Sequence, residues 1–578
     1  MDTAAKVQID ETVSGQNHED WRSFTSEKNV SYVVDQQNGN YSNQISWDLT
    51  SIVSQSGWMA LQEGYVLIPM CTTLTCASAQ TQAISSKAVC LKDNFINYMD
   101  SMQFFVNGQQ LIDQTSYSNF PIQILDKLTM SQDDLTLKGS ALNIAPDTPT
   151  ATRFSATATS GGDGYRNNLQ QIPYTTGTAT LTGTPNIIQD PALINQGITK
   201  RILNVWDATS TEAPPAINTA VKTAQILSPY FSSDGTTKKV GTWNYVVYLP
   251  LKRMSDLLAK YPLVKGSQIR LVINFNAGSV PITIGAATPA TYALASTPTM
   301  TAGQTQTAML TDSKLGMGTV AATGVPAIGV ASAATLATVV QTQVVSNVAN
   351  TTAAKGFVQL PNCRVYVPTY KVNPTYEERI LSNRVQKIRY IDWYQQPILN
   401  IANGSGFSQT LTTALANVQA LIMVPFANTS TSTTVYAAAG AAGTPQFQSP
   451  FDCAPATSLP GGMLAFQNFN VSVSGKNVWN QNQNYVYDNW SQEVQKLGLN
   501  SGLSRELSSG LVGLTDWTWS PFVIADLSRR EEGADKTYQS VTVMGTNNTG
   551  VPVDYYCFIA FQKEIEIDCL TGAVKKIF

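Results

Sequence analysis

The residue types that most often carry catalysis are scarce in this chain. Among 578 residues there is one histidine, His18, and it stands in the polar stretch 16–20. A Ser/His/Asp or Cys/His site would need that histidine, which we expect to lie in an unpacked terminal arm. A metal site with several histidines cannot be built from a single imidazole. The sequence therefore predicts no metal ion and no histidine-based catalysis.

Cysteine is the next candidate for chemistry. The chain contains Cys71, Cys76, Cys90, Cys363, Cys453, Cys557 and Cys569. Their number is odd, they are scattered, and no two have the CxxC spacing of a zinc or redox site. We interpret them as reduced thiols that serve as small core residues. The first residues, MDTAAK, lead into polar sequence, so we expect no secretory signal peptide and a protein that is not secreted.

Adjacent acidic residues occur at 133–134, 377–378 and 531–532. A glycosidase needs two carboxylates about 5–10 Å apart across a cleft, and neighbours on one strand point to opposite faces. The glycine-rich stretch 161–164 lacks the lysine and hydroxyl residue of a phosphate-binding loop. We therefore expect no catalytic residue, no cofactor site and no enzyme.

Charged residues cluster at 377–379 and at 529–532. Each cluster is either a solvated turn or a patch in which arginine meets the carboxylates of a neighbouring subunit. The possible inter-subunit contacts are Arg529, Arg530, Glu531, Glu532, Glu377, Glu378 and Arg379.

Charge is otherwise low. Charged residues make up 13% of the chain, against about 25% in a typical soluble domain. The net charge is −3, and residues 1–30 hold three basic against six acidic side chains. Without a basic arm we expect no sequence-specific binding of nucleic acid. Abundant Thr, Ser, Asn, Gln, Ala and Gly suits an all-β protein that buries surface against other copies of itself.

Short β-branched and aromatic runs, separated by Gly, Pro and Asn, predict strands. They include 65–69, 102–106, 245–249 and 269–273. Helical spacing predicts helices at 120–128, 251–261, 485–497 and 503–512. Stretches near 140–200, 277–355 and 427–448 are almost free of charge, and we interpret them as outward loops or small subdomains. The uncharged run 315–354 has too few large apolar residues to predict a membrane span.

An internal repeat divides the chain. Each half has a strand, a turn with glycine, a tyrosine and a helix ending in leucine, in that order. The pieces are 104–106, Gly108, Tyr117 and Leu128 in the first half, and 471–473, Gly475, Tyr485 and Leu497 in the second. Segment 67–69 also matches 421–425, segment 243–253 matches 519–529, and we assign a G strand to 269–275 and to 541–544.

Each half then carries about eight short strands with long loops at one end, which is typical of a jelly roll. The sequence predicts an all-β fold of two tandem eight-stranded jelly rolls, a double jelly roll, with long loop insertions and a few short helices. We expect an N-terminal arm at 1–25, a first jelly roll at 26–372 with insertions at about 140–200 and 277–355, and a second at 373–578. The junction falls at 372–375, where Pro374 interrupts strand pairing.

Two regions resemble the major capsid proteins of polinton-like viruses and virophages, in the adenovirus-like lineage of double-stranded DNA viruses. Segments 249–251 and 261–266 resemble the F-to-G region of double jelly-roll capsid proteins, and 526–529, 545–547 and 564–568 resemble the end of such chains. The resemblance covers roughly 30–578 in order and pattern, and the long insertions depart from it. It implies a homotrimer with six jelly rolls, a pseudo-hexameric capsomer that tiles an icosahedral shell.

The function expected from this resemblance is that of a structural major capsid protein located in the virion and assembled inside the host cell. Its partners would be itself, neighbouring capsomers, penton proteins and minor capsid proteins, with no membrane span. The alternative is a jelly-roll carbohydrate-binding or adhesion protein of the fibre or lectin type, because jelly rolls serve both purposes. A β-sandwich hydrolase is disfavoured by the shortage of histidine and of suitably spaced acids.

Overall fold

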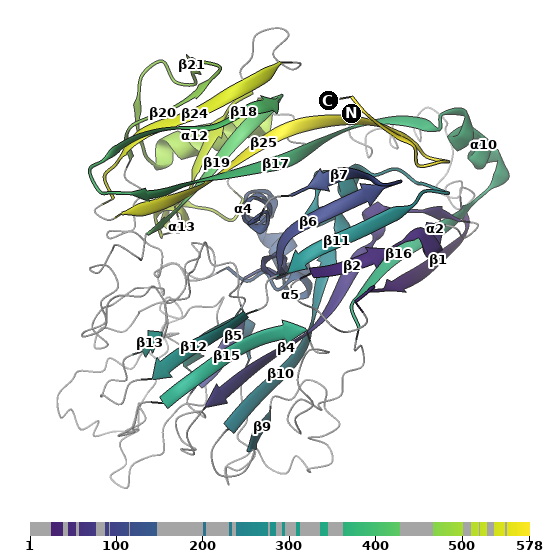
Figure 1. Ribbon diagram of the computed structural model, residues 1–578, viewed down its shortest axis with the longest axis horizontal. Coiled ribbons are helices and arrows are strands. Elements are labelled where there is room, and N and C mark those ends of the chain that lie inside the picture. The colour runs from purple at the N-terminus through teal and green to yellow at the C-terminus, as the bar shows by residue number, and fades with distance from the viewer. Residues whose placement is uncertain are drawn as a thin grey trace.

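Eight strands in the first half of the chain form two facing sheets in the computed structural model (Figure 1). In chain order they are β1 (Thr25–Val34), β2 (Gln44–Asp48), β4 (Tyr65–Cys76), β6 (Met99–Val106), β7 (Gln109–Asp113), β10 (Lys239–Pro250), β11 (Ile269–Phe275) and β16 (Arg364–Val372). One sheet has the order β1-β16-β4-β10 and the other β2-β11-β6-β7. Lettered B to I along the chain, these orders read B-I-D-G and C-H-E-F, which is the jelly-roll topology.

The second half repeats this order. Its strands are β17 (Val385–Ile401), β18 (Gly406–Ala416), β19 (Val418–Ala427), β20 (Phe466–Val473), β21 (Lys476–Asn477), β23 (Val523–Asp526), β24 (Tyr538–Asn547) and β25 (Val553–Asp568). The sheets run β17-β25-β19-β23 and β18-β24-β20-β21, again B-I-D-G and C-H-E-F. We call these sandwiches roll 1 and roll 2. The strand order confirms the predicted double jelly roll.

The structure describes only part of the chain. It covers residues 25–577 apart from 38–43, 54–56, 77–86, 92, 115, 147–199, 204–229, 234–238, 276–277, 285–291, 295–307, 313–335, 345–361, 428–465, 501–509, 520, 529–536 and 550–551. The predicted arm at 1–25, except Thr25, and most of the three charge-poor stretches lie outside the described residues.

Equivalent hairpins show how local sequence sets this topology. Strands β6 and β7 meet at Asn107 and Gly108, with φ of 47° and 77°, and β20 and β21 meet at Ser474 and Gly475, with φ of 50° and 78°. Two successive positive φ angles make the turn whose twist matches two paired strands, and glycine adopts such angles without strain. The repeated pattern of strand, glycine turn, tyrosine and helix is thus the E-F hairpin and the helix after it. That helix is α4 (Asn119–Thr129) in roll 1 and α12 (Tyr487–Asn500) in roll 2.

Other elements complete the described fold. Short strands at the first roll are β3 (Trp58–Met59), β5 (Lys87–Leu91), β8 (Ile202–Leu203), β9 (Tyr230–Ser233), β12 (Gly278–Ile284), β13 (Tyr292–Leu294), β14 (Ala308–Asp312) and β15 (Leu336–Val344). Roll 2 adds β22 (Gln483–Tyr485) and β26 (Val574–Lys576). The remaining helices are α2 (Thr50–Val53), η2 (Leu61–Glu63), η3 (Phe95–Tyr98), α5 (Gln132–Leu142), α8 (Leu251–Met254), α9 (Asp256–Lys260), α10 (Pro374–Ser382) and α13 (Leu514–Trp519).

Three sequence predictions need correction. The strands at 269–275 and 541–544 were assigned to position G, but β11 and β24 pair as H strands, and G is β10 in roll 1 and β23 in roll 2. Segment 249–251 accordingly lies at the end of G and segment 261–266 between G and H, not between F and G. The helix predicted at 251–261 is two short helices, because Ser255 is extended (φ −156°, ψ 144°) and caps α9 through the Leu257 N–H. In the stretch 277–355, predicted as an outward loop or small subdomain, β15 pairs with β4 and β12 pairs with β15.

Each of the two hydrophobic cores includes side chains from the other half of the chain. Ile388 and Tyr390 of β17 and Ile565 and Ile567 of β25 belong to the core of roll 1. Phe120, Ile124 and Leu128 of α4 belong to the core of roll 2. In Figure 1 the long strands β17 and β25 pass over roll 1, and α4 lies between the two rolls. The boundary at residue 373 therefore stays a prediction, although β16 does end at Val372 and α10 begins at Pro374.

Candidate assembly surfaces

The charged residues predicted as inter-subunit contacts divide into two groups. Arg529, Arg530, Glu531 and Glu532 lie outside the described residues. Glu377 on α10 accepts hydrogen bonds from Trp58 Nε1 at 3.1 Å and from Lys265 Nζ at 3.2 Å, so its carboxylate is used within the chain. Glu378 and Arg379 are exposed on the same helix. Their role as contacts with a neighbour stays a prediction.

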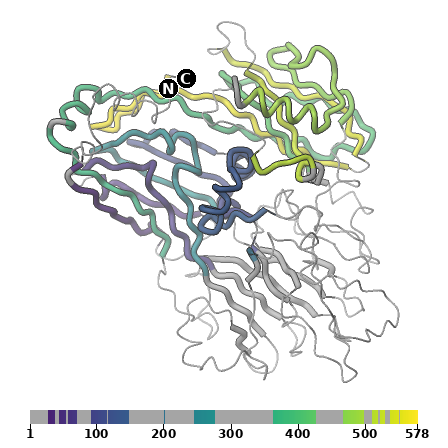
Figure 2. The backbone as a smooth tube through the Cα atoms, turned by 180° about the vertical axis from the view of Figure 1, so that it is seen from behind, coloured from purple at the N-terminus to yellow at the C-terminus, as the bar shows by residue number. Residues whose placement is uncertain are grey.

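The outer face of the roll 2 B-I-D-G sheet is covered by helix α4. Tyr117, just before α4, meets Tyr556 of β25 edge to face with ring centroids 5.2 Å apart, and Phe120 lies 6.2 Å from Phe558. The Leu511 N–H donates to the Lys127 carbonyl at 2.8 Å, which fastens the end of α4 to roll 2. Nearly every α4 side chain is buried, because the helix lies between its own roll and the next one. Figure 2 shows this position from behind.

Polar contacts extend this joint along β17. Asp256 of α9 accepts a hydrogen bond from the Ile391 N–H at 2.9 Å, and the Tyr390 hydroxyl donates to the Leu111 carbonyl at 2.8 Å. Asp392 is buried and pairs with Lys563 Nζ at 2.5 Å. Burial raises the pKa of Asp392, while the charge and hydrogen bond of Lys563 oppose the shift. The two rolls are thus held together by buried polar groups as well as by apolar packing.

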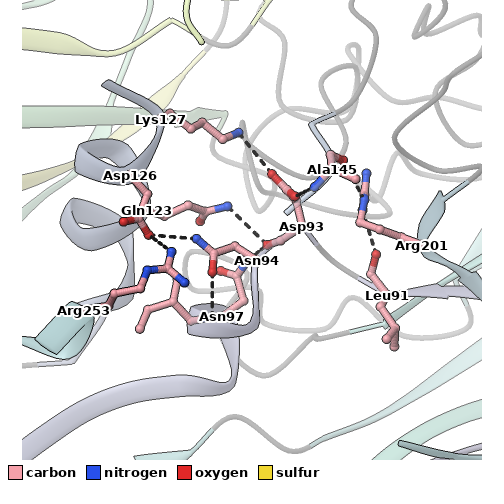
Figure 3. Close-up of polar contacts among 11 residues, drawn as sticks. Leu91, Asp93, Asn94, Asn97, Gln123, Asp126, Lys127, Ala145, Arg201 and Arg253 are labelled. Atoms are coloured by element: carbon pink, nitrogen blue, oxygen red, sulfur yellow. Dashed lines mark hydrogen bonds and ion pairs between the residues drawn. The ribbon is translucent and has the colours of Figure 1, made fainter. Parts of the chain in front are cut away.

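A buried polar cluster fixes α4 to roll 1 (Figure 3). Asp126 of α4 pairs with Arg253 of α8 and accepts a hydrogen bond from Asn94 Nδ2 at 3.1 Å. Lys127 approaches Asp93 at 3.7 Å. A buried carboxylate is costly unless it is paired, so these contacts make one placement of the helix strongly preferred.

The same cluster closes the base of the insertion between α5 and β10. Asp93 accepts a hydrogen bond from the Ala145 N–H at 2.6 Å. Arg201 is buried, and it donates from Nε to the Ala145 carbonyl at 3.0 Å and from Nη1 to the Leu91 carbonyl at 2.7 Å (Figure 3). The chain therefore leaves for residues 147–199 and returns from them at one place.

Tyrosines line the outer face of the roll 1 B-I-D-G sheet. Tyr32, Tyr366, Tyr65 and Tyr248 stand on β1, β16, β4 and β10 in that spatial order, and successive ring centroids are 5.5, 5.1 and 5.0 Å apart. Arg364 lies over the Tyr32 ring at 4.7 Å. Tyr32 is 52% exposed, and the other three rings are half-buried. We call these four side chains the tyrosine ladder.

Helix α12, the counterpart of α4, is buried on one side only. Trp490, Val494 and Leu497 face the core of roll 2. Asp488, Gln492 and Gln495, at helical spacing, are exposed. Among the described residues, then, the first roll's sheet face and the second roll's helix both lack the cover that their counterparts have.

The described titratable groups serve packing and pairing. Burial raises the pKa of Tyr261, Tyr485 and Tyr555 well above the ordinary value, so these phenols stay neutral. Burial likewise raises the pKa of the Cys569 thiol to about 11. Cys363, Cys557 and Cys569 are free and buried, as the sequence predicts for core thiols. Within the described ranges no group of three or more His, Cys, Asp or Glu residues is placed to hold a metal ion. None of the described helices combines the length and apolar character needed to cross a bilayer.

Sequence reasoning missed the tyrosine ladder and the buried cluster. Part of the ladder has a signal, since Tyr65 and Tyr248 each stand beside a core residue on a predicted strand and must point to the opposite face. The cluster has almost none, because Asp93, Asp126, Arg201 and Arg253 come from four separate segments. Asp133 and Asp134 prove to be the first turn of α5, where Asp134 forms a capping box with Ser131.

Comparison with known proteins gives structural similarity without sequence similarity. No family model matches the chain, and no curated protein matches it. A chain in the cryo-EM structure of the Sputnik virophage is similar with 10% identity and a TM-score of 0.46, over 96% of this chain and 88% of that one. The mavirus major capsid protein has 9% identity and a TM-score of 0.45 over 95% and 89%. The Faustovirus major capsid protein has 10% identity and a TM-score of 0.40 over 94% and 90%.

Because these scores are low, the assignment of the fold rests on the strand order of the two sandwiches. Each half of the chain has eight strands in the orders B-I-D-G and C-H-E-F. By that order the chain is a double jelly-roll protein.

Proposed function

We propose that this chain is a structural major capsid protein. Three copies associate into a pseudo-hexameric capsomer, and capsomers tile the icosahedral shell of a double-stranded DNA virus. The observation that carries the proposal is the repetition of one complete jelly roll in a single chain, with the two rolls locked side by side through α4. Two similar rolls per chain make a six-membered ring from three chains, which is a unit that packs in a hexagonal layer.

Several acidic side chains form ion pairs within the chain, which supports a structural role. Carboxylates such as Asp126, Asp392 and Glu377 are paired inside the chain, where they hold elements in register. The protein then acts without cofactor and without catalysis. Its partners are other copies of itself, with penton and minor capsid proteins at special positions of the shell, and it resides in the virion after assembly in the host cell.

A carbohydrate-binding role is less well supported. A sugar-binding platform presents the flat faces of aromatic rings to the ligand. In the tyrosine ladder the rings of Tyr65 and Tyr366 are stacked on each other, with an interplanar angle of 12° and centroids 5.1 Å apart. Their faces are therefore directed at one another.

Light scattering of the purified chain tests the proposal. At micromolar concentration and without added cofactor we expect a species of three times 62.4 kDa, because stable obligate interfaces bury more than about 2,000 Å². A monomer of 62.4 kDa that persists as concentration rises contradicts the proposal.

A further inference from the structure

The contact between the two rolls joins the helix of roll 1 to the sheet face of roll 2. The equivalent sheet face of roll 1 and the equivalent helix of roll 2 have no such contact among the described residues. Within the chain, the helix after the F strand of roll 1 covers the outer B-I-D-G face of roll 2, with Phe120 against Phe558. The equivalent face of roll 1 carries the tyrosine ladder, and the equivalent helix of roll 2 is α12. Figure 1 places β1 and β16 at one side of the molecule and α12 at the opposite side.

We propose that the α12 side of one copy docks on the tyrosine ladder of the next copy, so that the inter-subunit contact repeats the contact inside the chain. This proposal rests on the proposed function and deepens it, because it names the two surfaces that close the ring. The contact is head to tail: the ladder and α12 are different surfaces, and each copy offers one of each. Such a contact builds a closed ring when the rotation closes.

The ladder has the composition of a protein interface. Tyrosine and arginine are enriched at the centres of interfaces, and here Arg364 lies over Tyr32 beside a row of three further rings. Val30 and Val246 are 56% and 42% exposed on the same sheet, which extends the apolar surface along β1 and β10. A second copy would remove this surface from water.

The outward face of α12 is more polar than the face that α4 turns to roll 2, as expected for a surface that is exposed to water before subunits associate. Helix α4 turns Phe120, Ile124 and Leu128 to roll 2, and these side chains never meet solvent in the folded chain. Helix α12 exposes Asp488, Gln492 and Gln495. Amide and carboxylate groups keep the free subunit soluble and can hydrogen-bond to tyrosine hydroxyls and Arg364 after docking.

Two double variants separate the two surfaces. The ladder variant carries Val30→Lys and Tyr32→Lys, and the helix variant carries Gln492→Lys and Gln495→Lys. All four side chains are exposed, so folding is retained. The two lysines on the helix repel Arg364 across the contact, whereas those on the ladder remove its apolar and aromatic surface. The matched control carries Leu137→Lys and Leu399→Lys, which are 78% and 56% exposed away from both surfaces.

Native mass spectrometry at a fixed micromolar concentration gives the readout. We expect trimers for the wild type and for the control, and at least a tenfold loss of trimer for each variant alone. An equimolar mixture of the two variants should give a 1:1 dimer, because each supplies the surface that the other has lost. Dimers formed by one variant alone would indicate a contact of like surfaces and overturn the proposal.

A second measurement needs no substitution. Hydrogen exchange of the wild type should show protection of 27–34 and 487–497 that grows with concentration as trimers form. Trimers in which neither segment gains protection, or variants that remain trimeric, contradict the named surfaces and leave the capsid function intact. A wild-type chain that stays monomeric contradicts the proposed function itself.

Discussion

Asp392 on β17 and Lys563 on β25 form a charge pair within the roll 2 sheet, near the joint with roll 1, with Nζ and Oδ2 2.5 Å apart. The carboxyl is buried, and Asp113 adds an unfavourable charge nearby. We expect Lys563→Met to lower the free energy of unfolding by about 3 kcal/mol near neutral pH, because it leaves a buried carboxylate without its partner. Chemical denaturation of the variant measures this loss.

The pH dependence of that loss follows from the direction of the pKa shift. The pKa of Asp392 is raised in the folded state by burial, so this group favours folding below its unfolded pKa and that contribution is lost as pH rises through the folded value. Removing Lys563 raises the folded pKa further. The deficit of Lys563→Met should therefore shrink as the pH falls below neutral through the raised folded pKa of Asp392. Lys563→Met combined with Asp392→Asn is the control and should recover most of the loss, whereas a loss that is constant with pH contradicts the assignment.

Gly510 brings the backbone of roll 2 close to the end of α4. Its φ is +54°, and a Cβ there would clash with the Lys127 carbonyl oxygen. We expect Gly510→Ala to destabilise the protein by more than about 1 kcal/mol, since both the backbone angle and the space are unsuitable for alanine. Gly404→Ala is the matched control for the angle alone, with φ of +77° and nothing within 4 Å of the added Cβ. Equal melting temperatures of the two variants would contradict a tight contact at Gly510.

At the scale of elements, α4 belongs to both cores, so its truncation should affect both rolls. Ile124 is fully buried in the core of roll 2. We expect Ile124→Ala to cost about 2–5 kcal/mol and to lower one common calorimetric transition. Leu137→Ala on the exposed face of α5 should change stability by less than about 0.5 kcal/mol. Two separate transitions, of which only one moves, would show that the rolls unfold independently.

The exchange of segments also bears on the proposed boundary at residue 373. A fragment of 373–578 contains every strand of roll 2 but lacks Phe120, Ile124 and Leu128 of its core. We expect this fragment to show no cooperative unfolding, and a fragment of 117–129 added in trans should restore part of it. A cooperative transition of the isolated fragment near that of the whole chain contradicts a shared core.

Local sequence predicted where strands and helices occur better than it predicted which strands pair in a sheet. The E-F hairpins and the helices after them follow from glycine turns and short-range spacing, and both were predicted. The G and H strands were confused because 245–249 and 269–273 are similar apolar runs, and their sheet is set by pairing with residues far along the chain. The buried cluster around Asp126 and Arg253 could not be predicted, because it depends on how four distant segments meet.

At the scale of the whole molecule, one contact used twice explains why a chain would carry two jelly rolls. Inside the chain the contact is made through α4 and along β17, by apolar packing and by buried polar groups. Between chains we propose that the tyrosine ladder and α12 make it. In the proposed trimer, three chains would present six similar rolls to neighbouring capsomers. Arg201 fixes the base of the 147–199 insertion in each chain.

Negative-stain electron microscopy of the purified recombinant chain tests this account most directly. We expect class averages of a ring with a hexagonal outline and three-fold symmetry, built from three chains of 62.4 kDa and formed without cofactor. Particles with two lobes and the mass of one chain, at concentrations up to those used for shell assembly, would contradict it.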